Sequence, residues 1–384
     1  MSIIDKTKQY IADTYGRFPL TIVKGSGATC FDDAGKEYVD LTSGIGVNAL
    51  GFCDKGWADA VYAQLTTLQH TSNLFYTEPG AQLAERLIKR SGMSKVFFGN
   101  SGAEANEGAI KAARKYGHKT HGADCSTVIT LNQSFHGRTL ATLTATGQEQ
   151  FHKEFFPFPQ GFKYASPYDI EDVKKAVTPD VCAVMIELMQ GEGGGVPLEK
   201  EYVKALAKLC KEKEILLIVD EVQTGIGRTG TLFAFQQFDI TPDIVTCAKG
   251  LGGGLPIGAV LFADNADVFQ PGDHASTFGA NPAVCAGACY VLDKLDDAAL
   301  TRVTQVGNRL KEELLKLPKV KAVYGLGMMI ICDLDGIAAK DAVNAGLAEG
   351  VITLTAKERL RLLPPLTISD AELKTAIERL RKVL

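Results

Sequence analysis

The chain has 384 residues, 46% of them hydrophobic and 22% charged, an ordinary composition for a folded globular protein with one large domain and a smaller one. Its 41 basic and 45 acidic residues give a net charge of −4, so no basic excess indicates a nucleic-acid partner. No stretch approaches the ~20 apolar residues that span a membrane, and the first ten residues lack the apolar core of a signal peptide, so we expect small-molecule partners and no membrane.

The N-terminal part is predicted to begin with a short polar helix over residues 3–15. Residues 29–41 alternate between apolar and polar side chains and are interrupted at 33–36, which predicts two paired strands joined by a turn. A glycine-rich passage at 43–46 follows, and the next predicted helix covers residues 62–68.

From residue 79 onward, predicted strands and helices alternate along the chain. The predicted helices span residues 79–90, 103–116 and 199–213, and the predicted strands span residues 95–98, 127–131, 181–186, 215–219, 243–248 and 258–262. This alternation is typical of an α/β fold with a mostly parallel central sheet and helices on both faces.

The pattern changes after about residue 290. A long helix is predicted there with Leu300, Val303, Leu310 and Leu314 on one face, followed by strand-like residues 320–333. A capping box formed by Ser369 with a glutamate three residues later begins the last helix. We therefore predict a small α+β domain from both chain ends, residues 1–50 and 290–384, beside a large domain, residues 51–289.

Two buried strands in the middle of the chain end in residues of opposite charge. The strand at 215–219 is followed by Asp220 and Glu221, and the strand at 243–248 by Lys249. Ligands of parallel sheets bind beyond the strand ends, where desolvation can make a lysine nucleophilic beside a fixed carboxylate. This pair suits a Schiff-base lysine and an acid partner for a pyridinium nitrogen, and so predicts a pyridoxal phosphate site. Taken alone, Lys249 would more often be a solvated loop lysine, and Asp220 an acidic residue in the turn after a strand.

Residues 99–106 follow a predicted strand and open a helix. Free backbone amides at a helix start, with Gly102 and the Ser101 hydroxyl, form a site suited to a phosphate. Ser101 and Glu104 also have the spacing of an ordinary capping box, and both roles are compatible.

Two further loops carry candidate ligand groups. In residues 135–139, Phe135 could stack on a planar cofactor and Arg138 could hold a substrate carboxylate, although such a string taken alone is more often a core phenylalanine beside a surface arginine. In the glycine-rich loop 190–195, Glu192 is either a mobile carboxylate of the site or a solvated acid.

Other patterns give weaker alternatives. Residues 225–230 match the G-x-G-x-x-G dinucleotide fingerprint, but the expected strand, helix and later acid are missing around it, which leaves an NAD-dependent dehydrogenase as a remote alternative. His118 with His121, and Cys285 with Cys289, have spacings compatible with a metal but no second pair, so no metal site is predicted. The nine cysteines contain no C-x-x-C pair and indicate reduced thiols in the cytoplasm.

The order and spacing of five segments, 101–106, 135–139, 190–194, 220–225 and 249–250, resemble the class III pyridoxal phosphate-dependent aminotransferases over nearly the whole chain. Within this class, residues 15–20, 48–51 and 70–76 are most similar to acetylornithine aminotransferases. The resemblance implies a fold-type-I enzyme that works as a homodimer. Residues 52–56 and 187–190 depart from the usual pattern, which makes the donor less certain than the reaction class.

The resemblance also implies roles for individual residues in binding the cofactor. Lys249 would bind it covalently, Asp220 would keep its ring nitrogen protonated, Phe135 would stack on the ring and Gln223 would approach its hydroxyl group. Further cofactor contacts would come from Ser101, Gly102, Ala103, Glu221 and Val222. Thr277 would reach the cofactor of the partner subunit, so a monomer would be inactive.

The implied reaction is transfer of an amino group from N2-acetyl-L-ornithine to 2-oxoglutarate, in arginine biosynthesis. Arg138 would hold the donor's α-carboxylate and later the distal carboxylate of 2-oxoglutarate. Arg361 would be masked by Glu192 in the first half-reaction and freed in the second, and Ser276 and Tyr15 would also contact substrate. Ornithine, succinyldiaminopimelate and 4-aminobutyrate are alternative donors, and a catalytically silent binding protein is a further alternative.

Overall fold

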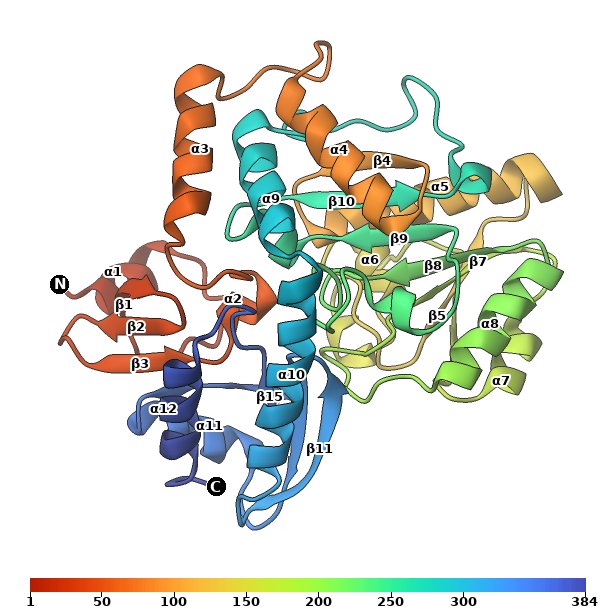
Figure 1. Ribbon diagram of the computed structural model, residues 1–384. Helices are drawn as coiled ribbons and strands as arrows, with labels where there is room; N and C mark the ends of the chain where they lie inside the picture. Colours follow the sequence, from red (N-terminus) through yellow and green to blue (C-terminus); the bar gives the residue numbers. More distant parts are fainter.

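The computed structural model describes residues 1–384 and contains three sheets (Figure 1). The largest has seven strands in the order β4-β10-β9-β8-β7-β5-β6. Its strands are β4 (Lys95–Gly99), β5 (Thr127–Leu131), β6 (Phe162–Ala165), β7 (Val181–Ile186), β8 (Leu216–Asp220), β9 (Ile244–Cys247) and β10 (Gly258–Phe262). Every residue of β7 and β8 is buried, because helices cover both faces of this sheet.

The predicted fold class is confirmed, with one difference in strand direction. The five strands from β9 to β6 are parallel, whereas β10 pairs antiparallel with both β9 and β4. The chain returns from β9 to β10 through a loop instead of a crossover helix, and antiparallel pairing needs no crossover. As a result, Gly258 at the start of β10 lies opposite Gly99 at the end of β4.

The helices around this sheet are α3 (Lys55–Thr67), α4 (Glu78–Ser91), α5 (Gly102–His121), α6 (Leu140–Ala145), α7 (Ile170–Ala176), α8 (Lys200–Glu212) and α9 (Pro282–Lys294). Helix α5 buries a row of small side chains, Ala105, Ala109, Ala112 and Ala113, which lets it lie close against the strands. Helix α3 starts earlier than the predicted 62–68 because Asp54 caps it by accepting from the Trp57 N–H.

Two smaller sheets complete the fold, and both ends of the chain meet in one of them. β1 (Ile22–Ser26), β2 (Thr29–Asp32) and β3 (Glu37–Asp40) form a sheet with β13 (Val351–Ile352), and β13 pairs parallel with β3. The other sheet contains β11 (Val320–Leu326), β12 (Met329–Leu334), β15 (Arg359–Leu362) and β14 (Leu354–Ala356). This arrangement supports the proposed grouping of residues 1–50 with 290–384, beside 51–289.

The remaining helices are α1 (Ile3–Tyr10), α2 (Ser43–Gly46), α10 (Asp297–Leu314), α11 (Ala339–Ala348) and α12 (Asp370–Leu380). Helix α1 ends five residues before the predicted end at residue 15, and none of its residues is buried. Helix α9 was not predicted, because its Ala, Gly and Cys residues give no apolar and polar faces; it packs on α3 and α4 and crosses the predicted boundary at residue 290.

The structure contains no helix that combines the length and apolar character needed to cross a bilayer. It also contains no group of three or more His, Cys, Asp or Glu side chains placed to hold a metal ion. All nine cysteines are free thiols, and Cys53 is the one that is exposed.

Candidate active site

A cavity of about 470 Å³ lies beyond the carboxyl ends of the parallel strands, where ligands of such sheets bind. Six segments that are far apart in the sequence line it. Its lining residues are Val47, Asn100, Ser101, Gly102, Ala103, Asn106, Phe135, His136, Gly137, Arg138, Glu187, Asp220, Val222, Gln223, Ala248, Lys249, Gly254, Leu255, Pro256 and Ile257. The cavity therefore brings together most of the residues singled out from the sequence.

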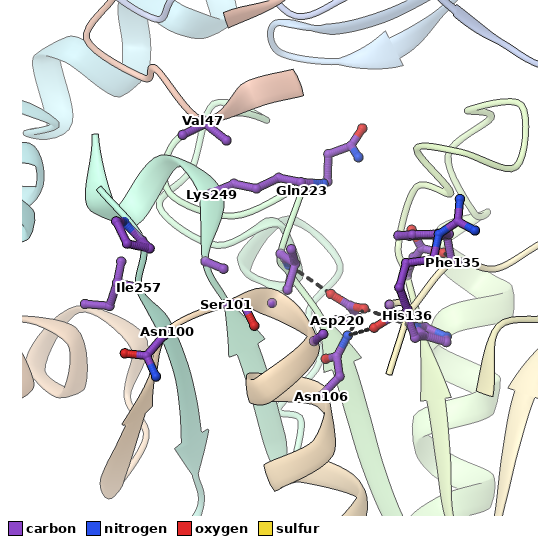
Figure 2. Close-up of a pocket in the computed structure, with 18 of the residues that line it drawn as sticks. Val47, Asn100, Ser101, Asn106, Phe135, His136, Asp220, Gln223, Lys249 and Ile257 are labelled. Atoms are coloured by element: carbon purple, nitrogen blue, oxygen red, sulfur yellow. Dashed lines mark hydrogen bonds and ion pairs between the residues drawn. The ribbon is translucent and has the colours of Figure 1, made fainter. Parts of the chain in front are cut away.

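Lys249 and Asp220 lie in this cavity at the ends of neighbouring strands. Asp220 is the last residue of β8, and Lys249 begins a short 3-10 helix directly after β9. In Figure 2 the Lys249 side chain lies above Asp220, on the same side of the strand ends. The φ angle of Lys249 is +39°, a conformation that residues with a side chain rarely adopt and that is typically kept at functional sites.

The environment of Lys249 favours a neutral amine. Burial lowers the pKa of the Lys249 ammonium, and the nearby Glu192 carboxylate opposes this effect without cancelling it. A neutral amine is the nucleophilic form, so Lys249 is suited to covalent attachment of a carbonyl group.

The carboxylate of Asp220 is held from three directions. Its Oδ2 accepts from Asn106 Nδ2 and faces His136 Nδ1, each at 2.8 Å, and its Oδ1 accepts from the Val222 N–H at 2.9 Å. Burial alone would lower the pKa of His136, but the hydrogen bond and negative charge of Asp220, together with the charge of Glu187, outweigh burial, so this pKa is raised. Asp220 is therefore a fixed carboxylate with its remaining face toward the cavity (Figure 2).

The start of α5 forms the opposite side of the cavity. Ser101 Oγ accepts from the Glu104 N–H at 3.1 Å, which is one half of the predicted capping box. The Glu104 side chain accepts from the Asn100 N–H at 2.7 Å, one residue before the cap, so the reciprocal half is shifted by one position. The N–H groups of Gly102 and Ala103 belong to the first helical turn and have no partner within the helix. A Cβ atom on Gly102 would lie 2.7 Å from Val222 Cγ1, so only glycine fits there.

Phe135 and Arg138 lie on the wall formed by the loop after β5. The Phe135 N–H donates to Glu187 Oε2 at 2.9 Å, and burial raises the pKa of Glu187. The Arg138 guanidinium lies 5.5 Å from the centre of the Phe135 ring and 4.2 Å from that of Phe151, in the geometry of cation–π contacts. Arg138 forms no ion pair within the chain and is exposed, so it is available to an incoming anion.

Glu192 and Arg361 form an ion pair beside the cavity. Arg361 Nη1 donates to Glu192 Oε1 at 2.6 Å and to the Gly191 carbonyl at 2.9 Å, and it lies 3.4 Å from Gln223 Oε1. Burial by itself would raise the pKa of Glu192, but the Arg361 guanidinium outweighs it and holds that pKa below its usual range. The pairing joins residues 169 positions apart, so spacing alone could not show it.

Some predicted site residues lie outside the cavity. The Glu221 side chain points away from it, accepting from the Thr224 hydroxyl and the Phe235 N–H, and burial raises the pKa of Glu221 to about 7. Its assignment as a cofactor contact is therefore not supported, because strand alternation turns it to the other face. Tyr15 is exposed on the N-terminal segment, and Thr277 is exposed on the loop before α9.

Ser276 lies at the edge of the same region, where its Oγ accepts from Asn100 Nδ2 at 3.0 Å and from the Gly279 N–H at 2.9 Å. The G-x-G-x-x-G string at 225–230 opens no long helix, and the next helical segment is a short 3-10 turn, Ala234–Gln237. Its Arg228 is buried and donates to the carbonyls of Met328 and Pro364, so the loop joins parts of the chain instead of presenting free amides.

Several residues of the cavity received no role from the sequence, among them Val47, Asn100, Asn106 and Glu187. A usable signal existed for Asn106, because it lies four positions after Gly102 and therefore on the same helical face. Glu187 directly follows β7, so the rule that ligands meet strand ends would also have selected it.

Comparisons with known proteins agree over the whole chain. The model of the family described as aminotransferase class-III matches residues 10–384. The chain is 53% identical to the acetylornithine aminotransferase of Haemophilus ducreyi, over 99% of this chain and 98% of that one.

Two solved structures share the fold. The N-acetylornithine aminotransferase of Stenotrophomonas maltophilia matches with a TM-score of 0.86 and 35% identity, over 99% of this chain and 98% of that one. The ornithine aminotransferase of Toxoplasma gondii, with PLP at partial occupancy in its active site, matches with a TM-score of 0.93 and 32% identity, over 99% of this chain and 93% of that one.

Proposed function

The chain belongs to the class III aminotransferases, and from this premise we propose that it transfers the amino group of N2-acetyl-L-ornithine to 2-oxoglutarate. The products are N-acetyl-L-glutamate 5-semialdehyde and L-glutamate, and the proposed place of the reaction is arginine biosynthesis in the cytoplasm. The observation that carries the reaction class is the placement of Lys249 and Asp220 in one cavity with the free amides of α5. The acetylornithine aminotransferase relatives support the choice of donor.

The residues present fit pyridoxal phosphate. We propose that the amides of Gly102 and Ala103 bind its phosphate, that the Phe135 ring stacks on the pyridine ring, and that Gln223 approaches its hydroxyl. Asp220, with its carboxylate fixed by three donors, is placed to hold a proton on the ring nitrogen. When bound, this cofactor withdraws electrons from the substrate carbon that carries the amine, which makes that carbon acidic.

The protein side chains then control binding and proton transfer. Lys249 would hold the cofactor through its amine, and its Nζ would remove and return the proton at the substrate carbon that carries the amino group. Arg138 binds the α-carboxylate of the donor through its two-pronged guanidinium. Because Arg138 has no competing ion pair, this contact requires no rearrangement inside the chain.

We propose that Glu192 masks Arg361 while the donor is bound and releases it for the α-carboxylate of 2-oxoglutarate. Replacing Glu192 with glutamine is expected to weaken productive donor binding about 10-fold, because a charged hydrogen bond of this kind is lost and Arg361 competes for the donor carboxylate. The second half-reaction is expected to change little. Rapid-mixing absorbance measures each half-reaction separately.

The matched control for this variant is Glu201→Gln, which changes an exposed glutamate on α8. It should leave both half-reactions as in the wild type. If Glu192→Gln also left both unchanged, the masking role would be abandoned.

We also propose that two copies of the chain form the working enzyme. Apolar side chains remain exposed on the segments 68–76 and 271–280, which contact each other through Asn73 Nδ2 and the carbonyls of Ser276 and Gly279. The exposed apolar residues are Leu68, Leu74, Phe75, Tyr76 and Phe278. A gathered apolar surface of this kind marks an interface, and it supports the proposal that Thr277, on the second of these segments, contacts the cofactor of the partner subunit. Contacts of Tyr15 and Ser276 with substrate stay predictions from the family resemblance.

The first experiment follows the visible absorption of the purified holoenzyme. Adding N2-acetylornithine without a keto acid is expected to remove the visible band of the bound cofactor, and adding 2-oxoglutarate should restore it. A band that persists with N2-acetylornithine but is lost with ornithine, succinyldiaminopimelate or 4-aminobutyrate would replace the proposed donor. A band that no amine removes would indicate a silent binding protein.

A further inference from the structure

Asn106 occupies a buried position at the centre of the hydrogen bonds around Asp220. Only 1% of Asn106 is exposed, and it uses both ends of its side-chain amide. Its Nδ2 donates to Asp220 Oδ2 at 2.8 Å and to the His136 carbonyl at 2.7 Å, while its Oδ1 accepts from the Thr246 hydroxyl at 2.7 Å. One side chain of α5 therefore connects the ends of β8 and β9 with the loop after β5.

The partners of Asn106 permit a single orientation of its amide. An ionised Asp220 and the His136 carbonyl can only accept hydrogen bonds, so the group facing them must be the NH2. The Thr246 hydroxyl donates on the other side; its alternative acceptor, Asp220 Oδ1, lies at 3.5 Å, which is longer than its 2.7 Å contact with Asn106. A reversed amide would place an oxygen against two acceptors.

We propose that Asn106 is a positioning residue for the transamination, and that Thr246 acts with it by fixing the amide. This inference rests on the proposed function and extends it: Asn106 acts through Asp220 and does not touch the substrate. Asn106 and His136 contact Oδ2 of Asp220, and the Val222 N–H donates to Oδ1. These three contacts fix both the position and the side-chain rotamer of the carboxylate. The ring nitrogen then meets a fixed negative charge, which needs no reorganisation during the reaction.

The position of Asn106 on α5 adds a second consequence. Gly102 and Asn106 lie four residues apart, about 6 Å along a helix and on one face of it. Gly102 belongs to the proposed phosphate site and Asn106 fixes Asp220. A rigid helical turn therefore sets the spacing between the groups that hold the two ends of the cofactor, in place of a flexible loop.

Two substitutions test the role of the amide. Asn106→Leu keeps the approximate size of the side chain and removes all three hydrogen bonds, and Thr246→Val removes only the hydroxyl that orients the amide. We expect kcat to fall about 100-fold for Asn106→Leu and about 10-fold for Thr246→Val, the range that follows from losing hydrogen bonds to a charged group. The KM for the amino donor should change less than threefold, because neither residue contacts it.

A purely structural role would not move the spectrum of the bound cofactor. In the Asn106→Leu and Thr246→Val holoenzymes we expect the visible band to shift toward that of a cofactor with an unprotonated ring nitrogen, and the dissociation constant of the cofactor from the apoprotein to rise. Thr246→Ser restores a hydroxyl at the same place and should recover most of what Thr246→Val loses.

The outcomes separate this inference from the proposed function. If wild-type enzyme prefers another amino donor, the proposed function fails, and the variants are compared with that donor. If Asn106→Leu does not fold, the comparison of Thr246→Val with Thr246→Ser decides. Wild-type kcat, visible band and cofactor affinity in Thr246→Val, or equal losses in Thr246→Val and Thr246→Ser, would overturn the role of Asn106.

Discussion

Replacing Lys249 with alanine is expected to lower the rate of transamination by at least about 10⁴-fold, because the variant loses both the amine that binds the cofactor and the group that moves the proton. No other lysine lines the cavity, so no neighbouring amine can take over. The protein itself should fold, since Lys249 is only partly buried and makes no side-chain hydrogen bond or ion pair within the chain. Steady-state kinetics and the visible spectrum measure both effects.

Lys249→Arg is the matched control for this prediction. It keeps a positive charge near Glu192, but its guanidinium does not lose its proton and cannot attack a carbonyl group. We therefore expect Lys249→Arg to be as inactive as Lys249→Ala. Substantial activity in either variant would contradict the assignment of Lys249.

Replacing Asp220 with asparagine is expected to lower kcat by about 10²–10⁴-fold, which is the usual contribution of a positioned acid or base. The size of the side chain is kept, and the charge that holds a proton on the ring nitrogen is removed. Asn106 and His136 both face the same oxygen of Asp220. An asparagine amide has only one oxygen, so it cannot replace both oxygens of the carboxylate as acceptors. Single-turnover kinetics should place this loss in the proton-transfer step.

The same variant should change the titration of His136, which NMR can follow in the apoprotein. Asp220 raises the pKa of buried His136 in the folded protein. Protonated His136 therefore stabilises the fold below its ordinary pKa of about 6.5, and this contribution is lost as the pH rises through the raised value. In Asp220→Asn the raised pKa should fall and this pH dependence should disappear. An unchanged His136 titration would show that Asp220 is not its cause.

The central chemistry of the site could be predicted from the sequence because it follows from strand ends. The strands before Asp220 and Lys249 are short, apolar and fully buried, and parallel neighbours end at one edge of a sheet. The same rule does not separate Asp220 from Glu221, since the two are adjacent. Side chains alternate between the two faces of a strand, so only one of the two residues at the end of β8 can face the cavity. The hydrogen bonds of Glu221 to Thr224 and Phe235 show that Glu221 points away and that Asp220 faces the cavity.

Contacts across the tertiary structure could not be predicted in the same way. The hydrogen bonds of Asn106 to His136 and Thr246 join segments 30 and 140 residues apart, and no local pattern records such a distance. The antiparallel course of β10 was missed for a related reason, because a buried strand has the same composition in either direction. Family resemblance supplied the pairing of Glu192 with Arg361 where residue spacing gave no information.

The pairing of β13 with β3 determines when the site can be completed during synthesis. Val351 and Ile352 supply the fourth strand of a sheet whose other strands are made within the first forty residues, and Arg361 follows only nine residues after Ile352. A ribosome must therefore produce almost the entire polypeptide before this edge is covered. Until then β3 presents an open strand edge to other nascent chains, a condition that favours aggregation and that chaperones commonly relieve.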